Sequence, residues 1–130
     1  IYNYARSLDS FSEVYFRLGA FLKNDNKNYV EPDIIVICDK NKLSERGYEG
    51  APDLIIEIIS PGSQGMDYGK KLYLYHDTGV CEYWIVDYEE NHVIVHNFEL
   101  NTVKMYTLSD KIPVGIYNGD LQIDFSTLNI

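Results

Sequence analysis

A single carboxylate stands inside the most apolar stretch of this sequence. Residues 54–59 read LIIEII, so aliphatic residues flank Glu57 on both sides. A run that is apolar at nearly every position is typical of a strand buried on both faces of a sheet. Burying a lone carboxylate costs free energy on the order of the whole stability of a small domain. We therefore expect Glu57 to be paired, protonated or bound to a metal ion.

Asp33 is the carboxylate best placed to share a cation with Glu57. The segments EPDIIVI (31–37) and APDLIIEI (51–58) both continue from Pro-Asp as apolar strands, and the loop between them allows antiparallel pairing. If Asp33 lies opposite Glu57, the two side chains share one face about 5 Å apart, whereas a shift of one residue would separate them. Such a pair can hold Mg²⁺ or Mn²⁺. The alternative is that Glu57 lies at a solvent-open rim or pairs with a Lys or Arg.

Asp53 and two lysines are the next candidates. Asp53 lies four residues before Glu57 in the same strand, about 13 Å away, which is too far to share one cation. Lys70 and Lys71 follow a Pro-Gly turn, on a helix that can fold back over the end of the sheet. An ammonium group there would orient a water molecule or stabilise developing negative charge. The alternative for Lys71 is an ordinary surface ion pair with Asp67, four residues earlier.

The hydrophobic pattern predicts a strand-rich domain with one clear helix. Alternating or continuous apolar residues predict strands over 11–18, 33–38, 53–59, 82–86, 92–98, 103–108 and 120–125. A helix is expected over 66–78, with Gly79 suited to its C-terminal cap. The polar segments 22–31 and 39–51 read as a turn and a loop. We predict a single α/β (α+β) domain over residues 1–130.

The charge and composition of the chain argue against some classes of partner and function. The formal net charge of −9 argues against non-specific attraction to nucleic acid, unless a divalent cation screens clustered carboxylates. No apolar run is long enough to span a membrane, so we expect no membrane partner. Cys38 and Cys81 are expected to be free, buried thiols of a cytoplasmic protein. The chain starts with Ile, which predicts a fragment or a processed form.

Other residues could carry chemistry, but each has a simpler interpretation. His92 and His96 are four residues apart in a predicted strand, about 13 Å, and so do not form one metal site. Trp84 is expected in the core rather than stacked on a base. Glu82 is expected to make a structural pairing. The loop 41–50 either contacts DNA phosphates through its basic residues or is an ordinary solvated loop, and we favour the latter.

Two long segments resemble a known family. EPDIIVICDKNKLSERGYEGAPDLIIEIISPGS (31–63) and DYGKKLYLYHDTGVCEYWIVD (67–87) are similar to the Uma2 family, also called DUF820, of the PD-(D/E)xK nuclease superfamily. The resemblance runs from about residue 13 to the C-terminus. It implies a restriction-endonuclease-like mixed β-sheet with a flanking helix. It also implies a site that uses Mg²⁺ (or Mn²⁺) to hydrolyse DNA.

The resemblance also implies roles for individual residues. Asp33 and Glu57 match the two superfamily acids and would be the metal ligands, although Asp53 carries the literal Pro-Asp beside the Glu57 motif. The usual superfamily lysine position, two residues after the acid, is Ile59 in this chain. Family members carry a lysine on the following helix instead, which matches Lys71.

Two further residues are secondary candidates. Lys70 is second to Lys71 for the role of the lysine. Family members add an acid from an N-terminal helix, of which residues 1–10 would be a remnant, so the N-terminal helical part is expected to be missing. Glu13 is a weak substitute for that acid.

Two functions follow from these patterns. The first is a metal-dependent endonuclease that cleaves DNA. The second is a catalytically inactive nuclease-fold protein that acts as an interaction or dimerisation module, which the acidic charge and the missing Lys at Ile59 favour. Exposed strand edges would then support a homodimer.

Overall fold

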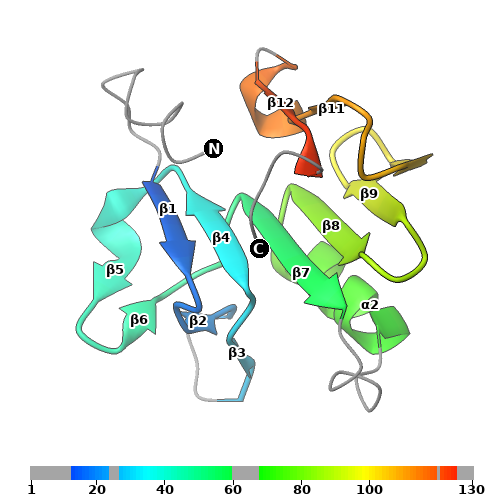
Figure 1. Cartoon of the computed structure of the whole chain (residues 1–130). Coiled ribbons are helices and arrows are strands. Elements are labelled where there is room, and N and C mark those ends of the chain that lie inside the picture. The colour runs from blue at the N-terminus through cyan, green and yellow to red at the C-terminus, as the bar shows by residue number, and fades with distance from the viewer. Residues whose placement is uncertain (1–12, 24–26, 60–67, 120, 126–130) are drawn as a thin grey trace.

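A six-stranded mixed sheet organises the molecule (Figure 1). The computed structural model describes residues 13–23, 27–59, 68–119 and 121–125. The sheet has the order β1-β4-β7-β8-β9-β10. Its strands are β1 (Glu13–Phe16), β4 (Ile34–Ile37), β7 (Leu54–Ile59), β8 (Glu82–Asp87), β9 (His92–Asn97) and β10 (Thr102–Tyr106). Strands β7 and β8 are parallel, and the other neighbouring pairs are antiparallel.

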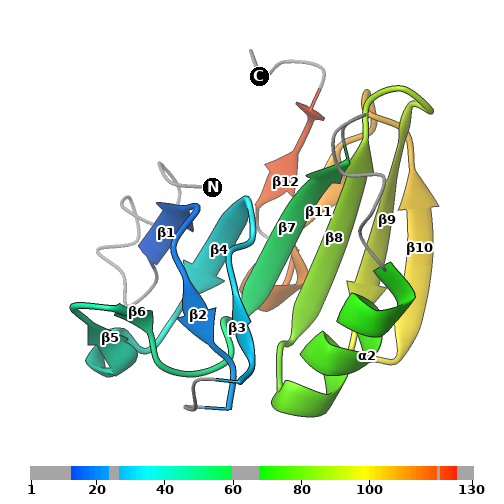
Figure 2. The ribbon, with the colours of Figure 1, turned by 90° about the horizontal axis from the view of Figure 1, so that it is seen from below.

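A helix crosses between the two parallel strands, as a parallel pair requires. Helix α2 (Tyr68–Thr78) covers one face of the sheet, in front of it in Figure 2. It ends at Gly79, whose φ is +100°, where the Val80 N–H donates to the Tyr75 carbonyl at 3.1 Å and the Gly79 N–H to the His76 carbonyl at 3.4 Å. This pattern closes the last turn of a helix and confirms the predicted C-terminal cap. No helix in the part of the chain described is long and apolar enough to cross a membrane.

A small four-stranded sheet packs on the same side as α2. It has the order β3-β2-β6-β5, from β3 (Tyr29–Val30), β2 (Ala20–Phe21), β6 (Gly47–Tyr48) and β5 (Leu43–Ser44), with the short helix η1 (Lys40–Lys42) before β5. The Tyr48 N–H donates to the Gly19 carbonyl at 2.8 Å. A Cβ on Gly47 would lie 2.4 Å from that carbonyl oxygen, so only glycine fits. The expectation of a turn over 22–31 and a loop over 39–51 therefore missed β3, η1, β5 and β6, because these short elements depend in part on the pairing of β6 with the distant β2.

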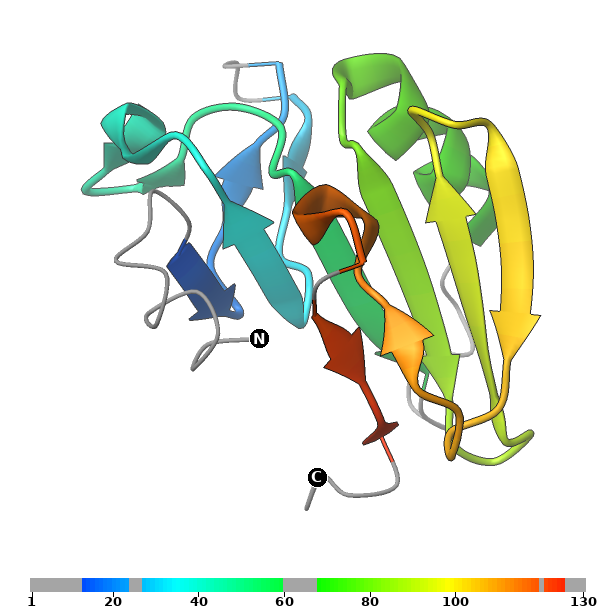
Figure 3. The same ribbon diagram turned by 90° about the horizontal axis from the view of Figure 1, so that it is seen from above.

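The opposite face is covered by the C-terminal segment. Strands β11 (Ile112–Pro113) and β12 (Gln122–Ile123) pair with each other, and η3 (Gly115–Tyr117) lies between them in sequence. Figure 3 shows them in front of the sheet, with α2 behind it. The predicted strand over 120–125 is thus present as the shorter β12.

The central strands are buried on both faces, as predicted. One core lies under β11 and β12 and includes Val36, Leu54, Ile56, Trp84 and Val86. The other lies under α2 and the small sheet and includes Ile35, Ile37, Ile55, Tyr83 and Ile85. Trp84 is fully buried, which confirms its expected place in the core. Cys38 and Cys81 form no disulfide bond, but Cys38 is exposed just after β4, so the expectation of a buried thiol was wrong there.

Candidate functional site

Glu57 lies on the α2 side of β7 and is buried, with 4% of its surface exposed. One carboxylate oxygen, Oε1, accepts hydrogen bonds from the Lys71 ammonium and the Tyr75 hydroxyl, both at 2.9 Å. The other, Oε2, accepts from the Tyr83 hydroxyl at 2.7 Å. Three donors and one opposite charge therefore satisfy this carboxylate inside the protein. The alternative that Glu57 pairs with a lysine is what the structure shows.

The two tyrosines respond to this buried charge. Burial raises the pKa of both the Tyr75 and the Tyr83 hydroxyl far above the usual 10, and the neighbouring Glu57 carboxylate raises it further. Their hydroxyls therefore stay protonated and act as hydrogen-bond donors across the whole physiological range.

Asp33 lies beside this cluster in the predicted register. Strand β4 pairs with β7 through Ile34 opposite Ile56 and Ile35 opposite Ile55. Continued by one residue, the register places Asp33 opposite Glu57. The Asp33 Oδ2 atom accepts the Ile58 N–H at 2.7 Å, which extends the contact between the two strands beyond their paired residues. The Asp33 charge also contributes, less than burial and Glu57, to the raised pKa of Tyr75.

The two candidate lysines differ in position. Lys71 points from α2 to Glu57, and 23% of its side chain is exposed. Lys70, one residue earlier, is exposed on the outside of the helix. Asp67, the alternative partner for Lys71, lies outside the described residues. The structure therefore places Lys71, and not Lys70, next to Glu57.

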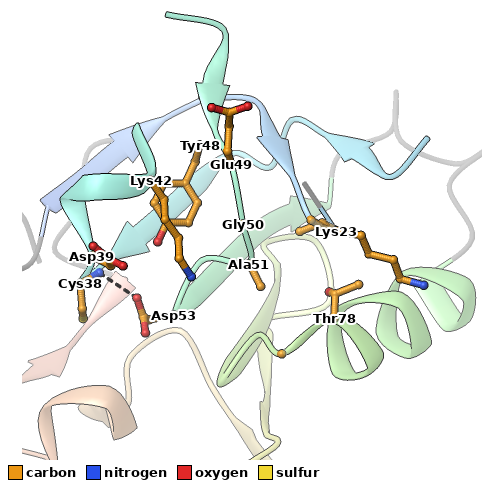
Figure 4. A pocket seen from close by; sticks show the side chains of 12 residues that line it. Lys23, Cys38, Asp39, Lys42, Tyr48, Glu49, Gly50, Ala51, Asp53 and Thr78 are labelled. Carbon is orange, nitrogen blue, oxygen red and sulfur yellow. Dashed lines mark hydrogen bonds between the residues drawn. The ribbon is translucent and has the colours of Figure 1, made fainter. Parts of the chain in front are cut away.

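Asp53 belongs to a different place, at the other end of β7. Its Oδ2 atom accepts the Cys38 N–H at 2.7 Å, drawn as the dashed line in Figure 4. It lines a pocket of about 590 Å³ together with Lys42 and Tyr48 from the η1 and β6 region and Thr78 at the end of α2. Neither Asp33 nor Glu57 lines this pocket. This separation agrees with the spacing of about 13 Å expected between Asp53 and Glu57 along the strand.

Glu13 is also distant from Glu57. It lies on β1 opposite Ile37, at the end of β4 away from Asp33. Its carboxylate accepts a hydrogen bond from the Tyr15 hydroxyl and forms an ion pair with Lys40 at 3.3 Å. These contacts lower the pKa of Glu13, with the Tyr15 hydrogen bond as the main cause. The structure does not bring this residue into the site.

The donor set allows a simple test of whether a magnesium ion would fit. No group of three or more His, Cys, Asp or Glu side chains that could hold a metal occurs among the described residues. Mg²⁺, however, is commonly bound by one or two protein carboxylates together with water and substrate phosphates. Asp33 and Glu57 supply two carboxylates on adjacent segments of the chain, at positions that the strand register places opposite each other. By number and type, these two carboxylates match what such an ion takes from a protein.

The remaining candidates have structural contacts. His76 stacks on Phe98 with ring centroids 4.8 Å apart, and His96 stacks on Tyr83 at 6.1 Å. Glu82 is buried and accepts from the Trp84 indole N–H at 2.8 Å and from the backbone N–H groups at the start of η3. The structural pairing expected for Glu82 is confirmed.

The sequence interpretation missed Tyr75 and Tyr83 as partners of Glu57. A signal was present for both. Tyr75 lies four residues after Lys71 and so shares its face of the helix. Tyr83 lies two residues before Ile85 and so on the same face of β8, and Ile85 is the residue paired with Glu57. The pattern allowed both tyrosines to be ordinary core residues, and only the folded geometry brings their hydroxyls to one carboxylate.

Comparisons with known proteins agree with this architecture. A crystal structure from Anabaena variabilis, described as a putative nuclease belonging to DUF820, matches with a TM-score of 0.72 at 20% identity, over 95% of this chain and 71% of that one. This match shows a shared fold. An uncharacterized protein of Synechocystis sp. is 32% identical over 63 residues, which are 48% of this chain. The match covers 33% of that relative, so the chain spans about a third of its length.

The family is shown by a match along most of the chain. The model of the Uma2 family, described as "Putative restriction endonuclease", matches residues 1–116 of the 130. The matched region contains Asp33, Glu57 and Lys71, together with strands β1 to β10 of the fold. This chain belongs to the Uma2 family.

Proposed function

We propose that this chain is the nuclease domain of a metal-dependent endonuclease that hydrolyses phosphodiester bonds in DNA. The observation that carries the proposal is the ion pair of Glu57 with Lys71, next to the Ile58 N–H that donates to Asp33. Membership of a family described as putative restriction endonucleases supports it. Two cysteines that form no disulfide bond suit a reducing compartment, so we place the protein in the cytoplasm.

Asp33 and Glu57 would hold the metal ion, Mg²⁺ or Mn²⁺. A bound divalent ion supplies a more acidic water molecule and neutralises charge on a phosphate. The chain itself contributes the position of the two carboxylates, which β4 and β7 fix through their register. It also contributes the Lys71 ammonium, which is held at the site by Glu57 and is exposed enough to reach a phosphate oxygen. There it would stabilise the negative charge that develops during phosphodiester cleavage.

The test is cleavage of supercoiled plasmid in the presence of Mg²⁺ or Mn²⁺. We expect Asp33→Ala, Glu57→Ala and Lys71→Ala each to lower the cleavage rate by about 100-fold or more. Asp53→Ala is the matched control for a Pro-Asp acid outside the site, and Lys70→Ala is the control for the neighbouring lysine. Circular dichroism would confirm that each variant is folded. Full cleavage by any of the three site variants would remove that residue from the mechanism.

A second candidate function is an interaction module that forms a homodimer. The observation that favours it is the open edge of β10, where Val103 and Met105 are 65% and 66% exposed. The engaged state of Glu57 and the net charge of −9 also fit a protein that does not approach DNA. Metal binding separates the two functions, because a dimerisation module does not need Asp33 and Glu57 to bind a divalent ion.

A further inference from the structure

A tyrosine hydroxyl holds each oxygen of the Glu57 carboxylate. We propose that Tyr75 and Tyr83 are positioning residues, which keep this carboxylate in one orientation whichever cation lies beside it, the Lys71 ammonium or a divalent metal ion. The part of this inference that concerns the metal ion rests on the proposed function. The part that concerns Lys71 rests on the contacts of the protein alone.

Each of the two tyrosines binds a different oxygen of the Glu57 carboxylate. Tyr75 donates to Oε1, which it shares with Lys71, and Tyr83 donates to Oε2. Turning the carboxylate about its terminal bond would break both phenolic hydrogen bonds at once. If Lys71 moves away, each oxygen still keeps one donor. With a single tyrosine, one oxygen would be held and the group would be free to reorient.

The two tyrosine rings are themselves fixed. Their centroids are 4.8 Å apart with an interplanar angle of 77°, an edge-to-face arrangement that favours one relative orientation. Tyr83 also stacks on His96. Both residues are fully buried. Donors that cannot move are what a fixed orientation of the acceptor requires.

The hydroxyl groups add little to the packing itself. A phenylalanine pair would fill the same core without the cost of burying two hydroxyls, a cost that is offset here by hydrogen bonds to Glu57. Tyr48 gives the comparison within this chain. It is 1% exposed and belongs to the same hydrophobic cluster, but it lies by the Asp53 pocket and not beside Glu57. Removing its hydroxyl therefore reports on a buried tyrosine that does not hold the carboxylate.

The first experiment titrates Mn²⁺ into the parent chain, Tyr75→Phe, Tyr83→Phe and the control Tyr48→Phe by calorimetry. We expect the first two variants to bind Mn²⁺ about 10-fold or more weakly, the range found when a partner of a metal ligand is removed. Tyr48→Phe should bind as the parent does. If Tyr75→Phe and Tyr83→Phe both bind Mn²⁺ as tightly as the parent does, the tyrosines do not position Glu57 for a metal ion. The proposed function would remain intact.

The second experiment needs no metal ion. A double-mutant cycle of Glu57→Gln and Lys71→Met, followed by urea unfolding, measures the coupling between these two side chains. We expect the coupling to be smaller in a Tyr83→Phe background than in a Tyr48→Phe background, because a mobile carboxylate meets Lys71 less often. A purely structural tyrosine would lower stability without changing the coupling.

The two experiments together distinguish the possible failures. If the parent binds no Mn²⁺, the proposed function fails, and the cycle alone decides whether the tyrosines position Glu57 for Lys71. Equal coupling in both backgrounds would overturn the proposal. Reduced coupling with Tyr83→Phe alone would support it, even in a protein that binds no metal.

Discussion

At the scale of single residues, the main feature is a carboxylate inside an apolar strand, whose cost of burial is offset by polar contacts. Glu57 forms an ion pair with a lysine of the following helix and accepts hydrogen bonds from two tyrosines. Breaking a buried pair by removing one partner is more harmful than replacing both, because the remaining charge loses its compensation. Lys71 therefore contributes to stability as well as to any chemistry of the site.

We predict that Lys71→Met destabilises the fold by about 1–3 kcal/mol. The lower part of this range reflects the two tyrosine hydrogen bonds that Glu57 keeps and the partial exposure of the lysine. Urea unfolding at pH 7 measures the change. Lys70→Met, one residue away and exposed, should change stability by less than about 0.5 kcal/mol. If the two substitutions lower the free energy of unfolding equally, the Glu57–Lys71 pair does not contribute to stability.

At the scale of elements, a second buried carboxylate joins β8 to the C-terminal segment. Glu82 is 1% exposed and accepts hydrogen bonds from the N–H groups of Gly115 at 3.2 Å and Ile116 at 3.1 Å. Burial raises the pKa of Glu82, although the hydrogen bonds from Trp84 and the η3 backbone oppose this effect. The stability of the contact between β8 and η3 should therefore depend on pH.

The sign follows from the raised pKa. Well below the unfolded-state pKa of about 4.5, Glu82 is protonated in both states and its contribution to stability is fully present. As the pH rises from this pKa to the higher pKa of the folded state, the unfolded chain releases its proton more readily and stability falls. We predict that Glu82→Gln, which cannot ionise, becomes more stable relative to the parent between pH 4 and pH 8. Urea unfolding across this range measures the difference.

A matched control isolates the buried site. Glu89→Gln removes the same charge from an exposed turn after β8. Its stability relative to the parent should change little over the same pH range. If the difference in free energy of unfolding between Glu82→Gln and the parent stays constant over this pH range, folding does not shift the pKa of Glu82.

At the scale of the whole molecule, β10 is an outer strand of the six-stranded sheet, and no other strand among the described residues pairs with its outer edge. Val103 and Met105 lie across from His96 and Ile94, on the face that α2 partly covers. Open apolar edges invite pairing with a second chain, and a symmetric pair of edges gives a closed dimer. This edge is where we place the proposed homodimer.

We predict that Val103→Lys and Met105→Lys lower the self-association of the protein. Light scattering at increasing concentration should give twice the chain mass for the parent and the mass of one chain for the variants. Phe16→Lys on β1 is the control, because this residue is 69% exposed on the opposite outer strand. A parent that stays monomeric, or a dimer that Phe16→Lys alone disrupts, would contradict the assignment to β10.

The sequence by itself determined the elements that carry the site. Continuous apolar runs predicted the central strands, the Pro-Asp segments allowed a register with Asp33 opposite Glu57, and Gly79 marked the end of the helix. These signals are local, since they depend on side-chain period and backbone preference within a few residues. The presence of one acid in an apolar run was enough to show that Glu57 needed a partner.

Only the tertiary structure decided which partners Glu57 has. Lys71 was one of two adjacent lysines with an open alternative, and Tyr75 and Tyr83 looked like core residues. The small sheet likewise depends on the approach of β6 to β2, where Gly47 leaves room for the Gly19 carbonyl. These contacts join segments far apart in the chain. Their geometry follows from how α2 and β8 pack on β7, which no local pattern of residues specifies.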